Sequence, residues 1–254
     1  MIHIKTDKEI KIMRQAGKIL ADILNKVISK VEPGVSTYNL NELAEDLIKK
    51  AGVKAAFKGF GPQGHEFPAA LCTSVNQEVV HGIPSKDKIL KRGDIIGIDC
   101  GVKFKGYYSD MAKTIPVGKL DLKTEKLLAV TRECLEKGIG AANSGNHLGD
   151  ISNAIQTHAE KNGFSVVKTL TGHGVGKELH EEPSVFNYGR PETGPRLKNG
   201  MVLALEPMIN QGTEEVKTKE DGWTIVTMDG SFSAHFEHTI LINDSEAEIL
   251  TRIK

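Results

Sequence analysis

The chain carries the same short pattern twice, once in each half. Lys91–Asp99 reads KRGDIIGID and Lys198–Glu206 reads KNGMVLALE, a separation of 107 residues at both ends. Apolar residues match apolar residues, and each copy ends on an acidic side chain. Such internal similarity predicts two related halves that bring one acid each to equivalent places.

Two helical patterns precede each copy. In the first half, Thr6–Glu9 is a capping-box sequence that starts a helix running to about residue 30, and a second helix begins at Ser36-Thr37 and ends before Gly52. In the second half, apolar residues recur at helical spacing over 127–139 and 151–162. Each half is therefore expected to contain a helix pair.

Short runs rich in β-branched residues follow the helices. They predict strands at 71–75 and 79–84, and a buried strand within 95–102 that ends on Asp99. Residues 103–114 are typical of the turn and return strand of a hairpin, which can bring Asp99 and Asp110 together. Helix pairs combined with antiparallel strands predict an α+β fold.

Composition excludes several classes of protein. The 33 basic and 33 acidic residues balance, so no overall field favours nucleic acid or an anionic membrane as a partner. No segment is apolar for long enough to cross a bilayer, and the N-terminus lacks a signal-peptide pattern, so we expect a cytoplasmic protein. Cys72, Cys100 and Cys134 form no Cys-x-x-Cys pair and are expected to be reduced thiols.

Five potential ligands lie in strand-like or glycine-rich stretches where a charged side chain has no structural reason to be: Asp99, Asp110, His173, Glu206 and Glu237. Each acid alone is most simply a solvated strand end, but buried carboxylates are costly unless they are paired or bind metal. Four carboxylates and one imidazole are too many ligands for one ion. Two divalent ions about 3.5–4 Å apart would use them all and would activate a water.

Several motifs resemble, in order and spacing, those of type I methionine aminopeptidases. The motifs are Val80–Pro84, Ile98–Gly101, Ser109–Thr114, Gly172–Gly176, His180–Pro183, Ala204–Met208 and Phe236–Thr239. The resemblance implies the pita-bread fold, in which two pseudo-symmetric halves each place a helix pair outside a curved antiparallel sheet. We expect one domain over 1–254, with halves of about 1–118 and 119–254.

The resemblance also implies a role for each ligand. Asp99 would hold one ion, His173 and Glu206 the other, and Asp110 and Glu237 would bridge both. The two ions would be drawn from Co, Mn, Fe, Zn or Ni, because oxygen and imidazole ligands accept several divalent metals. Glu206 would also move the proton of the attacking water.

Further residues would bind the substrate. By resemblance, His81 would contact the scissile amide and His180 would stabilise the developing oxyanion, although the sequence alone leaves a surface role open for His180. The resemblance places the methionine pocket at Phe67, Cys72 and Trp223. The chain departs from many relatives at Leu179, Gly61 and Gly64. His65 is a candidate neighbour of the pocket, whereas we interpret His3, His147, His158, His235 and His238 as ordinary surface, capping or flanking residues.

The implied substrate is the N-terminal methionine of nascent peptides in which the second residue is small and uncharged. The enzyme is expected to act as a monomer near the ribosome. Two alternatives remain. Prolidase-like and aminopeptidase-P-like enzymes share the fold, but they usually carry an N-terminal domain for which the first helix at about residue 6 leaves no room. A non-catalytic binding protein of this fold is expected to have replaced metal ligands, and none of the five is replaced here.

Overall fold

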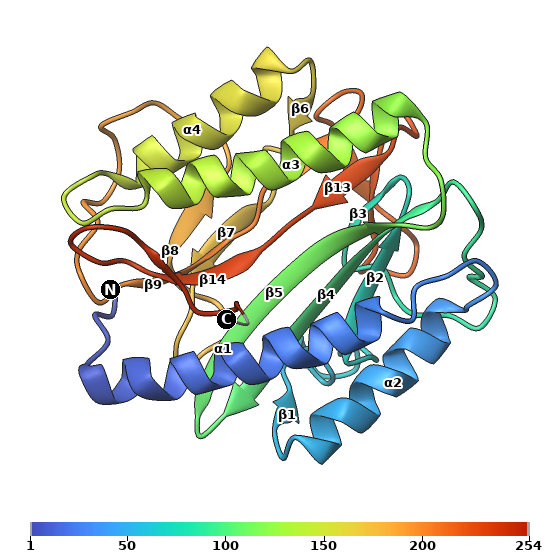
Figure 1. Cartoon of the computed structure of the whole chain (residues 1–254), viewed down its shortest axis with the longest axis horizontal. Coiled ribbons are helices and arrows are strands. Elements are labelled where there is room, and N and C mark those ends of the chain that lie inside the picture. The colour runs from blue at the N-terminus through green and yellow to red at the C-terminus, as the bar shows by residue number, and fades with distance from the viewer. Residues whose placement is uncertain (1, 253–254) are drawn as a thin grey trace.

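Two helix pairs enclose the strands in the computed structural model, which describes residues 2–252 (Figure 1). The helices are α1 (Asp7–Ile28), α2 (Thr37–Lys50), α3 (Leu122–Ala141) and α4 (Leu148–Lys161). The first-half strands are β1 (Lys54–Ala55), β2 (Leu71–Val75), β3 (Glu78–Val80), β4 (Ile95–Phe104) and β5 (Tyr107–Pro116). The second half contains β6 (Ser165–Val166), β7 (Thr171–Gly174), β8 (Glu181–Phe186), β9 (Val202–Leu205), β10 (Met208–Asn210), β11 (Val216–Thr218), β12 (Ile225–Thr227), β13 (Ser233–His235), β14 (His238–Leu241) and β15 (Glu248–Ile249).

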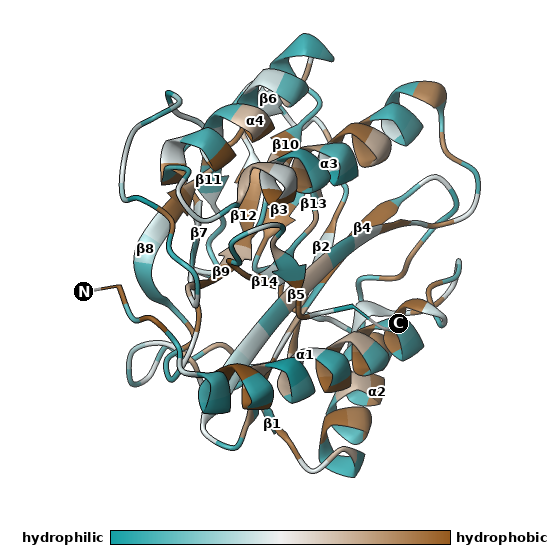
Figure 2. Cartoon of the chain, turned by 60° about the vertical axis from the view of Figure 1, so that its left-hand side comes forward, coloured by the Kyte–Doolittle hydropathy of each residue, from teal (hydrophilic) through white to brown (hydrophobic). Residues whose placement is uncertain are grey.

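The helices begin where their capping residues predict. Thr6 and Glu9 form the reciprocal capping box of α1, with the Thr6 backbone N–H donating to Glu9 Oε2 at 2.8 Å. The Ser36 hydroxyl accepts a hydrogen bond from the Asn39 backbone N–H and caps α2. Both helices alternate hydrophilic and hydrophobic residues along their length (Figure 2), because one face is buried and the other meets solvent.

Each helix pair covers strands of its own half. In the first half, β4 pairs with β5 on one edge and with β1 and β2 on the other, and the side chains between this sheet and α1 and α2 form one core. In the second half, one sheet has the strand order β15-β14-β9-β7-β8 and a smaller one the order β13-β10-β6, and a second core lies beneath α3 and α4. A further sheet, β11-β12-β3, joins second-half strands to β3 of the first half. Every pairing is antiparallel. The expected α+β architecture is confirmed; the division of the chain into one domain with a boundary near residue 118 stays a prediction.

The first-half sheet that contains β5 and the five-stranded sheet are joined between β5 and the segment around β14. The Glu237 backbone N–H donates to the Ala112 carbonyl at 2.8 Å, and the Thr239 hydroxyl donates to the Asp110 carbonyl at 2.8 Å. The Thr114 hydroxyl donates to the His235 carbonyl, also at 2.8 Å. These hydrogen bonds hold residues from the two halves side by side (Figure 1), and so they determine where the acids of each half meet.

Two predicted strand ends were wrong. Strand β4 continues past Asp99 to Phe104, because hairpin partners on β5 pair with it along its whole length. The predicted strand over 79–84 ends at Val80, because His81 has φ +58 and leaves the extended conformation. In the second half, β9 does end immediately before its acid, Glu206, which is followed by Pro207.

Candidate metal centre and pocket

Asp99 and Asp110 are placed by the β4–β5 hairpin. Asp110 lies opposite Gly101, and Asp99 lies opposite Ala112, so the two acids are diagonal neighbours on paired strands. Residues two apart along a strand share a face of the sheet, and both carboxylates therefore project to the same side. The hairpin does bring these two acids together, as the sequence suggests.

The second half contributes the other three predicted ligands. His173 is on β7, opposite Ala204 of β9, while Glu206 follows β9 and Glu237 precedes β14. The ligand atoms of Asp110, His173 and Glu237 all lie within 4.8 Å of one another. His173 Nε2 is 3.5 Å from Glu206 Oε1. Side chains more than 120 residues apart in sequence, such as Asp110 and Glu237, thus converge on one place.

Two glycines allow the backbone to approach His173 closely. A Cβ at Gly172 would lie 2.3 Å from the Ala204 carbonyl oxygen, and a Cβ at Gly174 would lie 2.2 Å from the Glu182 carbonyl oxygen. Any side chain at either position would push β7 away from its neighbours. The glycines flanking His173 therefore determine how deeply the imidazole sits among the acids.

The protonation of His173 suits a metal ligand. Its Nδ1 lies 2.9 Å from the Gly174 carbonyl oxygen, which can only accept a hydrogen bond, so Nδ1 is the protonated nitrogen. Burial lowers the pKa of His173 to about 3, with a smaller contribution from His180, and the ring is neutral at pH 7. The lone pair of Nε2 is consequently free and faces the acids.

The four acids are unfavourable neighbours without a cation. Burial, followed by repulsion between the carboxylates, raises the pKa of Asp99 and Glu237 well above their usual range, and burial raises that of Asp110 to about 7. Glu206 is shifted upward in the same way. Asp99 Oδ1 and Glu237 Oε1 are buried without a hydrogen-bond partner. Buried oxygens that lack donors fit a divalent cation, and these residues therefore suit the implied metal.

An apolar pocket opens directly beside the acids. Cys72 lies opposite Asp99 on the neighbouring strand β2, and it shares a buried cluster with Phe67 and Leu179. Trp223 packs edge-on against Phe67, with ring centroids 5.3 Å apart. One cavity is lined by these apolar residues and by all five predicted ligands, together with Phe57, Phe60, His81 and His180. The three predicted pocket residues and the two predicted histidines thus line the same cavity as the five predicted ligands.

His81 and His180 both line this cavity. The His180 ring is 4.3 Å from that of His173, and the edge of Phe60 packs against it at 5.2 Å. Burial lowers the pKa of both imidazoles, that of His81 to about 4, so both are neutral at pH 7. His65 stacks on Trp223 with ring centroids 5.5 Å apart, which confirms that it lies next to the pocket.

A buried lysine supports the turn that carries His180. Lys5 Nζ donates to Glu181 Oε2 at 2.8 Å, and only 1% of the Lys5 side chain is exposed. Glu181 also accepts hydrogen bonds from the Lys177 and Glu178 backbone N–H groups. Because Glu181 follows His180 directly, the segment before α1 fixes one end of that turn.

Sequence reasoning missed His235, which we interpreted as an ordinary residue flanking Glu237. In the structure its side chain is buried, and Nε2 lies 3.6 Å from Glu206 Oε2 without a hydrogen-bond partner. The signal was the alternation along the chain, since His235 and Glu237 are two residues apart and point to the same side of an extended segment. His238 points elsewhere and meets the Thr251 hydroxyl at 2.8 Å.

A larger groove lies away from these residues. It measures about 780 Å³ and runs between α1 and α3, with Met111–Pro116 at its base. Of the five predicted ligands, none lines it. Size therefore does not identify the candidate site, whereas the convergence of ligand atoms does.

Comparison with known proteins agrees with this geometry. Residues 11–244 match the model of metallopeptidase family M24. A methionine aminopeptidase of Clostridium acetobutylicum is 51% identical over 251 residues, which cover 99% of each chain. Of solved structures, methionine aminopeptidase from Thermotoga maritima has a TM-score of 0.97 and 49% identity, and all of both chains is covered.

The fold is shared more widely. Prolidase from Pyrococcus furiosus has a TM-score of 0.77 at 26% identity, over 99% of this chain and 66% of the prolidase chain. The chain is thus more similar in sequence to the methionine aminopeptidase from Thermotoga maritima than to this prolidase, and it covers a larger share of that protein's length. No helix within residues 2–252 is long and apolar enough to span a membrane.

Proposed function

Because the chain belongs to metallopeptidase family M24 and, within it, to the methionine aminopeptidases with the pita-bread fold, we propose that it removes the N-terminal methionine from polypeptides. Membership of this family implies the use of divalent metal. The observation that carries the proposal is the convergence of metal-ligating atoms beside a pocket of apolar side chains. An unbranched thioether side chain suits such a pocket, because Phe67 and Trp223 offer aromatic surface to sulfur.

We further propose a dinuclear site. Asp99 would hold one ion, His173 and Glu206 the other, and Asp110 and Glu237 would bridge them, with the metals drawn from Co, Mn, Fe, Zn or Ni. Bound there, the ions would polarise the scissile carbonyl and lower the pKa of a water to near neutrality. Five ligands for two ions leave coordination positions for water and substrate, which favours a catalytic site over a closed structural one.

The remaining steps belong to side chains of this chain. Glu206 accepts the proton of the attacking water and passes it to the leaving amine, because its carboxylate lines the cavity and lies 3.5 Å from His173 Nε2. Neutral His180 donates a hydrogen bond to the developing oxyanion, and neutral His81 contacts the scissile amide. The pocket of Phe67, Cys72 and Trp223 orients the methionine side chain.

The finer properties of the substrate follow from the same proposal. A small, uncharged second residue would be preferred, as the resemblance to type I methionine aminopeptidases implies. The enzyme would act as a monomer on nascent peptides near the ribosome, and hence in the cytoplasm. The balanced net charge gives no support for direct binding to nucleic acid.

The test is methionine release from Met-Ala-Ser by protein loaded with each metal in turn. We expect turnover with at least one metal, none after chelation, and none in Glu206→Ala with any metal. Turnover by Glu206→Ala close to that of the wild type would disprove the role of this residue. Wild-type protein that binds none of the added metals and stays inactive with each of them would instead favour a non-catalytic binding protein.

Peptide choice separates the proposal from prolidase-like activity. Met-Ala-Ser and Ala-Pro peptides are compared at equal concentration. Cleavage of the first and not the second supports a methionine aminopeptidase, whereas preferential cleavage next to proline would contradict it. Rapid cleavage of Met-Lys or Met-Trp peptides would contradict the preference for a small second residue.

A further inference from the structure

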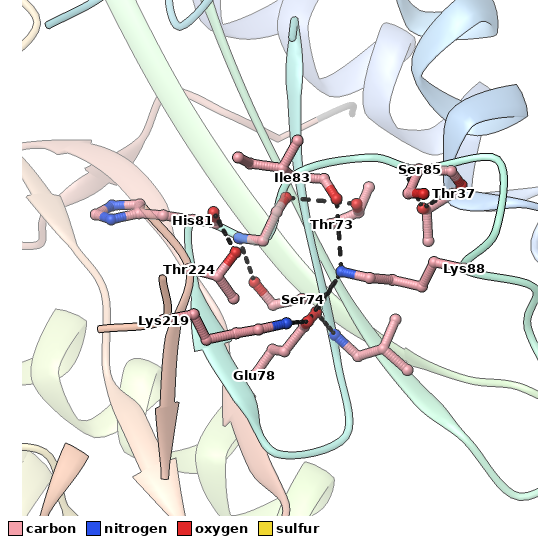
Figure 3. A network of polar contacts seen from close by, with 12 residues as sticks. Thr37, Thr73, Ser74, Glu78, His81, Ile83, Ser85, Lys88, Lys219 and Thr224 are labelled. Atoms are coloured by element: carbon pink, nitrogen blue, oxygen red, sulfur yellow. Dashed lines mark hydrogen bonds and ion pairs between the residues drawn. The ribbon is translucent and has the colours of Figure 1, made fainter. Parts of the chain in front are cut away.

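Glu78 is a buried carboxylate that the proposed chemistry does not use. It begins β3, three residues before His81, and is 6% exposed. Two lysines from different segments reach it: Lys88 Nζ at 2.7 and 2.9 Å, and Lys219 Nζ at 3.4 Å (Figure 3). The Val75 backbone N–H donates to the same carboxylate at 2.9 Å. Glu78 is thus the common partner of three separate parts of the chain.

Lys88 ties Glu78 to the loop that carries His81. This loop follows β3, and Lys88 Nζ also lies 3.5 Å from the Ile83 carbonyl oxygen. The loop is fixed at Gly82 as well, whose carbonyl accepts a hydrogen bond from the Thr73 backbone N–H at 2.7 Å. A Cβ on Gly82 would lie 2.2 Å from the Thr73 carbonyl oxygen and 3.0 Å from Glu78 Oε2, so the backbone passes directly over the carboxylate.

Lys219 ties Glu78 to the segment that carries Trp223. Lys219 follows β11, and its backbone N–H donates to the Thr224 carbonyl at 2.8 Å. The Thr224 hydroxyl lies 2.7 Å from Asp221 and 3.5 Å from the His81 carbonyl oxygen. Figure 3 shows the His81 carbonyl facing Thr224 while the imidazole points away from the network. The rings of His81 and Trp223 are 6.5 Å apart.

His81 needs such support because of its backbone. Its φ of +58 lies in the left-handed region, which is unfavourable for a residue with a side chain unless surrounding contacts hold it. The contacts on either side of His81 are those of β3, which contains Glu78, and of the loop that Lys88 fixes. A carboxylate bonded to both segments therefore holds the strained residue in place.

We propose that Glu78 is a positioning residue, which through Lys88 and Lys219 sets His81 and Trp223 in their places around the substrate. This inference rests on the proposed function. Glu78 acts through the other two residues and does not itself line the cavity. The Lys88 contact controls His81 and hence turnover, and the Lys219 contact controls Trp223 and hence methionine binding.

The first experiment is kinetic. Glu78→Gln keeps the shape of the side chain and removes the charge that pairs with both lysines. We expect kcat/KM for Met-Ala-Ser to fall about 10- to 100-fold, the effect of a small displacement of a group at the reacting bond. Lys88→Met should lower mainly kcat, and Lys219→Met should raise mainly KM. The matched control is Asp22→Asn, which removes the exposed ion pair with Lys26 on α1 and should leave kcat/KM unchanged.

A double-mutant cycle separates positioning from general loss of stability. If Glu78 acts through His81, then adding Glu78→Gln or Lys88→Met to a His81→Ala protein should lower kcat by less than about twofold. An equal loss of kcat with and without His81 would overturn the proposal. Wild-type kcat/KM in a folded Glu78→Gln protein would also overturn it.

The second experiment does not depend on activity. Trp223 is the only tryptophan, and its fluorescence reports the position of its segment in metal-free protein. About half of the Lys219 side chain is exposed, so the Lys219→Met protein should fold normally. Its tryptophan emission should be red-shifted and more strongly quenched by acrylamide. Unchanged fluorescence in both Lys219→Met and Glu78→Gln would refute the role at Trp223. An inactive wild type would disprove the proposed function and leave this measurement valid.

Discussion

At the scale of single residues, the side chains of the candidate site form an electrostatically unfavourable arrangement. Four carboxylates with raised pKa values lie next to neutral imidazoles, and Asp99 and Glu237 each have an oxygen with no partner. Neither burial nor repulsion is offset by a cationic side chain among the residues that line the cavity. The arrangement is therefore favourable to a bound cation and costly for folding in its absence.

Asp110 provides a test with opposite effects on stability and activity. Asp110→Asn removes one of the repelling charges while keeping the shape of the side chain, and so it should raise the melting temperature of metal-free protein. The same change removes a metal ligand and should abolish methionine release. Thermal melts in the presence of a chelator and a peptide assay with added metal measure the two effects. A destabilised metal-free variant would show that repulsion is not what dominates at this position.

At the scale of elements, connections between the halves position the catalytic groups. Strand β5 meets residues 235–239 through backbone and threonine hydrogen bonds, and the segment before α1 reaches the turn after β7 through Lys5. At both places, the first-half chain supports second-half residues. Neither connection could be read from the repeat, which describes each half separately.

The Lys5–Glu181 pair provides the test at this scale. Lys5→Met keeps the length and apolar stem of the side chain but leaves Glu181 without its buried cation, so we expect a loss of about 3 kcal/mol in the free energy of unfolding. Turnover should also fall, because Glu181 adjoins His180. Urea unfolding and peptide kinetics measure these effects, with Asp22→Asn as the exposed-pair control. A change below about 0.5 kcal/mol, as for a surface pair, would contradict the prediction.

At the scale of the whole molecule, metal binding and folding are linked through the same carboxyl groups. The pKa of Asp110 rises from 3.8 to about 7 in the folded protein, so its neutral form is favoured there. A group whose folded pKa is raised stabilises the fold below its unfolded pKa and loses that contribution as pH rises to the folded value. Metal-free protein should therefore lose stability between about pH 4 and pH 7 from this group.

Divalent metal should reverse this trend. Binding requires carboxylates, so apparent affinity should increase with pH over the same range, and protons should be released on binding near pH 7. Calorimetric titration in two buffers of different ionisation enthalpy measures the protons, and thermal melts with and without metal measure the stability. Affinity that is independent of pH from 5 to 7 would rule out these acids as the principal ligands.

Local patterns in the sequence were sufficient for the helices and for strands β2 to β5, although two strand ends were wrong, whereas the strands of the second half were not predicted one by one. Thr6 and Ser36 mark helix starts by side-chain hydrogen bonds that involve only their own neighbours, and short runs rich in β-branched residues identify these strands. The five candidate metal ligands were also visible, because acids in apolar strands are costly unless something binds them. These properties depend on residues near one another in the chain.

Only the tertiary structure decided the distances between segments that are far apart in sequence. His235 was interpreted as an ordinary residue flanking Glu237, yet in the folded chain its Nε2 lies 3.6 Å from Glu206 Oε2. The Glu78 network likewise joins Lys88 and Lys219, which no local pattern connects. The type of each side chain and its local conformation are encoded in short stretches of sequence. The partners of a buried charge depend instead on how the sheets of the two halves pack, because packing involves the whole chain at once.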